Sequence, residues 1–424
     1  MARPVAVTGM GLVTPLGADI ETAWKRALAG ESGVRSIRSF DASGLPVSGA
    51  GEVSAEEMAA LRARLPEEFS GEGERRVLFA LDAAQSAFAG AGLAPGEIDP
   101  LRAGVVMGTG LGTYRMEDFA ACAAPEGKAD WPRFAREAAR AHPGGYFKNP
   151  PERATSLIAR FLGLAGPAAT LTSACAAAAQ AVGLGMRMIR RGEADVVLCG
   201  GADSMIHPLG MAIFLLLGAA STAAGPPESV CRPFDRRRSG LVVGEGAGVV
   251  VLESEEHAAR RGAEPHALLC GYGASMDAYQ VTAPDPRGGG AARAMAGALR
   301  DAGAAPGEIA YVNAHGTGTR LNDPAETLAI KEVFGDAAKR LAVSSTKSLI
   351  GHLIAACGGP ELIFTVLSVQ RGVVHPTRNL ENPDPKCDLD CVPGGAREMP
   401  VAAAISNSFG FGGQNAALVV RKAA

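Results

Sequence analysis

AGLAPGEI at residues 91–98 returns, with one change, as AGAAPGEI at residues 302–309, about half the chain later. Each copy follows a stretch with helical character, LFALDAAQSAF (78–88) and ARAMAGALR (292–300). Chance could give one matched octet, but it does not also repeat the same flanking order. The repeat therefore predicts a chain folded from two related halves.

The segments after the two octets also correspond. Each octet leads into an apolar run that ends in a glycine-rich turn, GVVMGTGLG (104–112) and AYVNAHGTGTR (310–320). Short apolar runs closed by glycine are typical of buried strands. Further strand candidates are PVAVTGMG (4–11), TLTSAC (170–175), ADVVLCGGADS (194–204), GAGVVVLES (246–254), HALLCGYG (266–273) and AAISNSFGFGG (403–413), of which we expect the last to be the final strand.

These elements predict an α/β fold of two pseudo-repeated βαβαβ-type halves, each with a mostly parallel or mixed sheet between helices. We expect the halves to comprise residues 1–257 and 258–424, and to pack tightly because no stretch has the composition of a domain linker. The segment at about 113–160 is richer in charge, proline and aromatic residues. It is expected to form a cap or tunnel-lining insertion in the first half.

Composition excludes several classes of function. A chain of 424 residues that is 47% hydrophobic can bury a large core, and its formal net charge of −3 gives no overall footprint for nucleic acid. No apolar run is long enough to span a membrane. The opening MARPVAVTGMG lacks the pattern of a secretory signal. We therefore expect a soluble cytoplasmic protein.

The cysteines give no sign of a disulfide framework or a metal site. In a long cytosolic chain, the default is reduced thiols that act as small core residues. Cys387 and Cys391 are close in sequence, but no second pair of cysteines or histidines completes a zinc site nearby, so no metal is expected. The eight are Cys122, Cys175, Cys199, Cys231, Cys270, Cys357, Cys387 and Cys391.

Cys175 differs from the other cysteines in its context. It lies between an apolar strand candidate and four alanines, which are the best helix formers. This places Cys175 at or next to a helix N-terminus, where unpaired backbone N–H groups and the helix dipole favour a thiolate. A buried structural thiol is the alternative interpretation.

Two histidines complete a candidate catalytic group. His315 in NAHGTGT and His352 in STKSLIGHLIAACGG both lie in strand-end or glycine-flanked turns. One cysteine with separate histidines suits nucleophilic catalysis, and two imidazole N–H donors could hold one carbonyl oxygen. Each histidine could instead be a satisfied core residue. Lys347 and Glu361 flank His352, either as supports for it or as an ordinary surface ion pair.

The glycine-rich turns point to close backbone approach, with no sign of nucleotide binding. GFGGQN (410–415) could aim backbone N–H groups at a reacting group, although taken alone it could be a simple turn. GMGLVTPLG (9–17), GTG (108–110) and GTGT (316–319) lack the dinucleotide pattern. We find no phosphate-binding loop.

Five longer motifs together resemble one family, the β-ketoacyl-acyl carrier protein synthases. The family has the thiolase fold, so the resemblance implies a layered α-β-α-β-α body. It also implies decarboxylative Claisen condensation of an acyl thioester with a malonyl thioester. The motifs are VTGMGLVTPLG (7–17), RPFDRRRSGLVVGEGAGVVVLE (232–253), HGTGTRLNDPAE (315–326), STKSLIGHLIAACGGPE (345–361) and NSFGFGGQN (407–415).

The resemblance assigns roles residue by residue. It implies a triad of Cys175 as acyl-accepting nucleophile with His315 and His352 as binders of the malonyl carbonyl. Lys347 and Glu361 match the family's supporting ion pair. The remaining matches are an oxyanion hole of the Cys175 and Phe411 backbone N–H groups, Phe409 and Phe411 beside the acyl pocket, and Thr317 and Thr319 as contacts of the phosphopantetheine arm.

The resemblance also implies partners. The substrates are carried on the phosphopantetheine of an acyl carrier protein, with no separate cofactor. Arg75 and Arg76 fall where carrier-docking residues are expected, and a dimer is expected near residues 168–175. That dimer would be a homodimer or a heterodimer with a chain-length-factor-like relative.

Departures from the family pattern bear on the pathway. They include AAAAQ after the nucleophile, Gln280 and Gln414 where histidine and threonine are common, Ala223 at a position often basic, and the unusual segment 150–161. They favour a polyketide or secondary-lipid synthase over a housekeeping fatty-acid synthase. Rival interpretations are a thiolase, a non-catalytic chain-length-factor partner and a cysteine hydrolase. A thiolase needs a second cysteine near its C-terminus, whereas the last cysteine here, Cys391, precedes the final strand and GFGGQN occupies the critical turn. Cys175, His315 and His352 argue against the chain-length-factor partner, and a cysteine hydrolase would need no decarboxylating pair of histidines.

Overall fold

The computed structural model describes residues 4–112, 128, 130–133, 135–136 and 150–423. Its core is a ten-stranded mixed sheet in the order β10-β9-β13-β14-β8-β1-β7-β6-β4-β5. The strands are β1 (Val5–Val13), β4 (Ala103–Thr109), β5 (Ala168–Leu171), β6 (Val196–Ser204), β7 (Glu245–Ser254), β8 (Ala267–Met276), β9 (Tyr311–Asn313), β10 (Ala342–Ser344), β13 (Ala403–Gly410) and β14 (Gln414–Arg421).

The strand order repeats between the two halves of the chain. From the edge inward, β5-β4-β6-β7-β1 has the same sequence of parallel and antiparallel neighbours as β10-β9-β13-β14-β8. The two sets of five meet where β1 pairs with β8 over three residue pairs, Val5 with Leu269 through Val7 with Ala267. The repeat expected from the two octets is therefore present in the topology.

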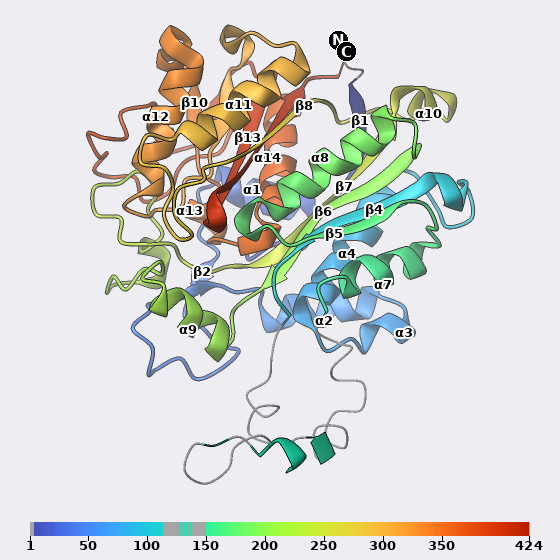
Figure 1. Cartoon of the computed structure of the whole chain (residues 1–424), viewed down its shortest axis with the longest axis horizontal. Coiled ribbons are helices and arrows are strands. Elements are labelled where there is room, and N and C mark those ends of the chain that lie inside the picture. The colour runs from blue at the N-terminus through green and yellow to red at the C-terminus, as the bar shows by residue number, and fades with distance from the viewer. Residues whose placement is uncertain (1–3, 113–127, 129, 134, 137–149, 424) are drawn as a thin grey trace.

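Helices form three layers around these strands, as the thiolase fold requires (Figure 1). Helices α8 and α14 form the inner layer, because each contacts strands of both halves. Helix α4 covers β1, β6 and β7 on one outer face, and α11 covers β8 and β14 on the other. Apolar residues repeat at helical spacing along these helices, which is why their buried faces fit against the sheet.

The remaining elements are short or peripheral, and two small two-stranded ladders, β2–β3 and β11–β12, lie outside the main sheet. The bounds are α1 (Ile20–Leu28), β2 (Val34–Arg35), β3 (Ala50–Gly51), α2 (Ala55–Arg64), α3 (Glu67–Ser70), α4 (Arg75–Gly90), α7 (Arg153–Leu162), α8 (Ala177–Arg190), α9 (Pro208–Leu216), α10 (Glu255–Arg260), α11 (Gly289–Ala302), α12 (Asn322–Phe334), α13 (Lys347–Ile350), α14 (Gly358–Arg371), β11 (Val373–Val374) and β12 (Arg397–Glu398).

Two expectations need comment. The segment 403–413 was expected to hold the final strand, but β14 follows it and pairs with it through a tight turn at Gly410–Gln414. The prediction missed the hairpin because the glycine-rich turn was interpreted as the end of the last strand. Most of the expected cap at 113–160 lies outside the described residues. Within the described part of the chain, no helix is long and apolar enough to cross a membrane.

Candidate active site

Cys175 lies at the turn between β5 and α8. Residues Ala174–Ala176 form a single 3-10 turn, and α8 begins at Ala177, as the alanine run predicted. Ala174 has a positive φ of 48°. A left-handed conformation in a residue with a side chain costs roughly 1–3 kcal/mol and persists where the surrounding structure imposes it. The strain places Cys175 directly in front of the helix N-terminus, buried in the protein.

The turn between β13 and β14 passes close to the nucleophile. A Cβ added at Gly410 would lie 3.2 Å from the backbone nitrogens of Cys175 and Ala176, so only glycine allows this approach without movement of its neighbours. The backbone N–H groups of Phe411 and Cys175 both act on the Cys175 thiol. Two N–H donors from different halves of the chain therefore converge on one sulfur.

His315 and His352 face Cys175 from the second half. His315 follows β9, and its backbone N–H donates to Glu326 at 2.9 Å. The two imidazole rings stand almost perpendicular, at 89°, with centroids 5.4 Å apart. The Cys175 sulfur and a ring nitrogen of each histidine all lie within 4.8 Å of one another. The structure thus brings together the three residues that the sequence singled out.

The hydrogen bonds of His352 fix its tautomer. The Ile354 backbone N–H donates to Nδ1 at 2.9 Å, so Nδ1 carries no proton and Nε2 is the ring's donor. Ile354 has a positive φ of 49°, which directs its N–H back toward the ring. The Cys357 sulfur also lies 3.3 Å from Nδ1. His352 is therefore held as a neutral hydrogen-bond donor.

Lys347 and Glu361 form a buried ion pair behind the histidines, so a surface pair is the wrong interpretation. Both side chains are 1% exposed, and the Lys347 ammonium donates to Glu361. Burial lowers the pKa of Lys347, but the adjacent Cys357 and Glu361 raise it more, and its pKa lies above the usual value. Lys347 is a fixed positive charge at neutral pH.

This charge and the burial set the protonation of the site. Burial first, and Lys347 second, hold the pKa values of His315 and His352 well below the usual range. Burial raises the pKa of Cys175 to about 11, although Lys347 and the Phe411 N–H act in the opposite direction. The backbone N–H groups of Phe411 and Cys175 lower the pKa of this thiol, which is the direction expected at a helix N-terminus, but desolvation outweighs them. The site holds a thiol beside two neutral imidazoles.

The three residues open into a cavity of about 670 Å³. Thr317, Thr319, Phe409 and Phe411, each expected to contact substrate, all line it. A cysteine and two neutral histidines are also ligands that zinc accepts. An ion there would occupy the nucleophile, so we interpret the group as a site for covalent chemistry that needs no metal.

Two buried carboxylates that the sequence analysis did not single out hold the loop with His315 and the two threonines. Glu326 accepts the N–H groups of His315 and Gly316, and Asp323 accepts those of Thr317 and Gly318. Both acids lie in the first turns of α12. Their spacing of three residues directly after a glycine-rich turn was the available signal, because acids at a helix start can bind the preceding backbone.

Arg75 and Arg76 are not a docking pair, and that prediction was wrong. The Arg76 side chain is fully buried and donates to the backbone oxygens of Gly110 and Pro150. The Arg75 guanidinium donates to Glu245, whose side chain is completely buried, and to the Val53 oxygen. Arg76 is therefore enclosed, and Arg75, whose side chain is 29% exposed, is held by its ion pair with Glu245.

Reversing these charges should damage the fold. Arg76→Glu would bury a carboxylate beside Glu74, and Arg75→Glu would face Glu245, so we expect each to lower the free energy of unfolding by about 3–5 kcal/mol. Urea denaturation checks this, with Lys25→Glu on the exposed side of α1 as the control. A variant that unfolds like the wild type while losing activity only with carrier-borne substrate would restore the docking role.

Comparison with known proteins agrees with this geometry. The family description "Beta-ketoacyl synthase, N-terminal domain" matches residues 2–258, and "Beta-ketoacyl synthase, C-terminal domain" matches residues 266–381. The chain is 40% identical over 422 residues to 3-oxoacyl-[acyl-carrier-protein] synthase 2 of Coxiella burnetii, covering 99% of both chains. It is also 40% identical over 420 residues to the Staphylococcus aureus protein of that name, covering 99% of this chain and 98% of that protein.

Solved structures of similar shape include a polyketide ketosynthase. A β-ketoacyl synthase from Burkholderia phymatum superimposes with a TM-score of 0.89 at 34% identity, and the ishigamide ketosynthase/chain length factor with 0.86 at 35%. A type II polyketide ketosynthase in complex with its acyl-carrier protein gives 0.88 at 31%, and all three matches cover 100% of both chains. With its full-length relatives and both family domains, the chain belongs to the β-ketoacyl synthases, condensing enzymes of the acyltransferase type on the thiolase fold.

Proposed function

We propose that the chain condenses an acyl group held on Cys175 with the malonyl group of a malonyl carrier protein, releasing carbon dioxide and forming a β-ketoacyl thioester. The observation that carries the proposal is the convergence of one thiol, two neutral imidazoles and two backbone N–H groups on a single cavity. Each group matches a charge that develops in one step of the reaction.

Acyl transfer comes first. The Cys175 sulfur attacks the carbonyl carbon of the acyl thioester, the carrier's thiolate leaves, and the Cys175 proton passes to that thiolate. Negative charge on the carbonyl oxygen is stabilised by the N–H groups of Cys175 and Phe411, because donors already in place cost no reorganisation. The strained Ala174 turn and Gly410 are what set these two donors around the sulfur.

Decarboxylation follows in the same cavity. The malonyl thioester carbonyl accepts hydrogen bonds from His315 and from His352 Nε2. The bond to the carboxylate breaks, carbon dioxide leaves, and the electron pair of that bond forms an enolate whose oxygen is held by these donors. The enolate carbon then attacks the acyl carbonyl on Cys175, and the sulfur leaves as a thiolate as the new carbon–carbon bond forms. The thiolate takes up a proton from solvent, which restores the thiol. Neutral rings are needed because each must donate without giving up its proton.

Another part of the cavity wall can bind the phosphopantetheine arm that carries the substrate. Thr317 and Thr319 lie on its wall, where their hydroxyls hydrogen-bond to each other at 2.9 Å. We infer that this polar part of the wall binds the phosphopantetheine arm. No separate cofactor is needed, since the arm belongs to the carrier protein.

For the pathway, we propose a specialised polyketide or secondary-lipid synthase. Gln280 lines the cavity where histidine is common in the family, which supports a non-housekeeping substrate. Fatty-acid elongation is the second candidate, because curated relatives at 40% identity are named 3-oxoacyl-[acyl-carrier-protein] synthase 2.

A single experiment tests both levels of the proposal. The protein is incubated with hexanoyl carrier protein and excess malonyl carrier protein, without any reductase, and the carrier-bound products are measured by mass spectrometry. A polyketide synthase should extend the unreduced product repeatedly, whereas a fatty-acid synthase should stop after one condensation. No carbon dioxide and no β-ketoacyl product would contradict the condensing function itself.

We also propose that the chain forms a dimer through β5. Among the residues that the structure describes, this strand is the edge of the sheet and pairs only with β4, and it is partly exposed, so its free side can pair with a second strand. Sedimentation at micromolar concentration should give twice the monomer mass. A monomer would contradict the proposal, and a dimer formed only on co-expression with a relative that lacks the cysteine would favour the heterodimer.

A further inference from the structure

A second hollow adjoins the mouth of the active-site cavity. It has a volume of about 380 Å³ and is lined by five cationic side chains and a single carboxylate; we call it the cationic hollow. Ser239 and Arg320 line both the hollow and the cavity that contains Cys175, so the two spaces are neighbours that share part of their walls. The lining residues are Arg236, Arg237, Arg238, Ser239, Arg320, Asp384 and Lys386.

Three of these cations are available to a partner. Arg236, Arg320 and Lys386 are exposed, and within the described part of the chain their side chains make no hydrogen bond or ion pair. Arg237 is also exposed but contacts Glu381 and Asp235. Many other arginines of the protein are paired with carboxylates, so unpaired cations gathered at one opening favour an anionic partner.

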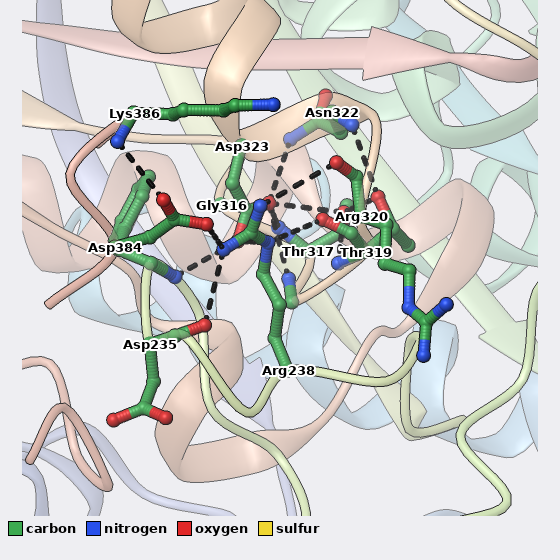
Figure 2. A network of polar contacts seen from close by, with 12 residues as sticks. Asp235, Arg238, Gly316, Thr317, Thr319, Arg320, Asn322, Asp323, Asp384 and Lys386 are labelled. Carbon is green, nitrogen blue, oxygen red and sulfur yellow. Dashed lines mark hydrogen bonds and ion pairs between the residues drawn. The ribbon is translucent and has the colours of Figure 1, made fainter. Parts of the chain in front are cut away.

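Arg238 forms the rigid floor of the hollow. Its guanidinium is buried and donates to Asp384 at 2.6 Å and to the Thr319 backbone oxygen at 2.8 Å, and it lies 3.8 Å from Asp323. Figure 2 shows these contacts, with the Arg320 guanidinium directed away from them. The hollow is thus fixed to the same loop that carries the Thr317 and Thr319 wall of the cavity.

The rim of the cavity beside the hollow is apolar. Leu217, Val281 and Leu321 line the opening and are 45%, 76% and 59% exposed. Large exposed aliphatic side chains beside unpaired cations are the composition of a protein-docking surface. A small anion would contact only the cationic side chains, whereas a protein partner would also contact the exposed aliphatic side chains of the rim.

We propose that the cationic hollow and its apolar rim dock the acidic face of the carrier protein that delivers the thioester. The inference rests on the proposed function and assigns to this surface the task that Arg75 and Arg76 cannot perform. A carrier seated here has its arm at the mouth of the cavity, because Arg320 and Ser239 border both spaces. Charge attraction mainly raises the rate of productive encounter.

The test compares two donors of the same acyl group. Hexanoyl carrier protein from a bacterial type II system and hexanoyl-pantetheine are each mixed with the protein, and the rate of Cys175 acylation is followed by intact mass. The variant is Arg236→Glu with Lys386→Glu, because neither residue lines the Cys175 cavity. The control is Lys25→Glu with Arg340→Glu, which makes the same change of net charge at exposed sites outside both spaces.

We expect the variant to lose about tenfold or more in carrier-dependent acylation at low salt, with a smaller loss at high salt. Its acylation by hexanoyl-pantetheine and both rates of the control should stay near the wild-type values. An equal loss with both donors, or a carrier-dependent rate equal to that of the control, overturns the docking surface. Failure of the wild type to be acylated by either donor would instead contradict the proposed function.

Discussion

Cys175→Ala is expected to abolish both acylation and chain extension, with a fall in condensation rate of about 10⁴-fold or more. Of the seven described cysteines, Cys175 is the one that lines the active-site cavity. Intact mass after incubation with an acyl carrier protein measures acylation, and product formation measures extension. Cys391→Ala is the matched control, since that buried thiol lies outside the cavity and the variant should retain both steps.

Cys175→Gln should separate the two steps. The amide occupies the place of the acylated sulfur, so His315 and His352 can still hold a malonyl thioester and carbon dioxide release should continue while extension stops. Carbon dioxide release from malonyl carrier protein is the measurement. A covalent acyl-enzyme in the alanine variant, or complete loss of decarboxylation in the glutamine variant together with an intact fold, would contradict the assigned role.

Lys347→Met is expected to reduce decarboxylation more strongly than acyl transfer. Burial lowers the pKa values of both imidazoles most, and the buried ammonium lowers them further. Neutral rings are needed to hold the malonyl carbonyl, whereas the N–H groups that serve acyl transfer are backbone atoms. The single change also leaves Glu361 buried without its partner, which costs about 3–5 kcal/mol of unfolding free energy.

The double variant Lys347→Met with Glu361→Gln separates the two effects. It removes both charges, so its stability should recover while its decarboxylation stays low. The two half-reactions are measured by intact mass and carbon dioxide release, with urea denaturation alongside. Equal losses of both half-reactions in the stable double variant would show that Lys347 does not act through the histidines.

The sequence was sufficient for the fold and for the central group of the site. The repeated octets predicted two related halves, because duplicated sequence imposes duplicated topology, and the run of alanines after Cys175 predicted the helix start. The motif resemblance supplied the pairing of Cys175 with His315 and His352, which no local pattern could have supplied because these residues are 140 and 177 positions apart in the chain.

What the sequence did not reveal depends on burial and on backbone torsions. Arg76 is in a charged, surface-like stretch yet is fully enclosed, and residue type alone does not indicate which face of α4 is covered. The raised pKa of Cys175 results from desolvation, which is set by residues distant in the chain. The role of Ile354 comes from its φ angle, which an aliphatic residue gives no reason to expect.

The two halves of the chain contain equivalent turns that contribute different groups to the active site. Ala174 and Ile354 occupy the same place in the two halves, each a left-handed residue just ahead of an inner-layer helix, α8 or α14. One copy of this turn presents the nucleophile, and the other sets the proton on the histidine that meets it. The same turn therefore has a different role in each half, and the two halves meet where β1 pairs with β8. Neither half alone holds a complete reaction centre, so a chain cut between them would regain chemistry only when both pieces reassociate.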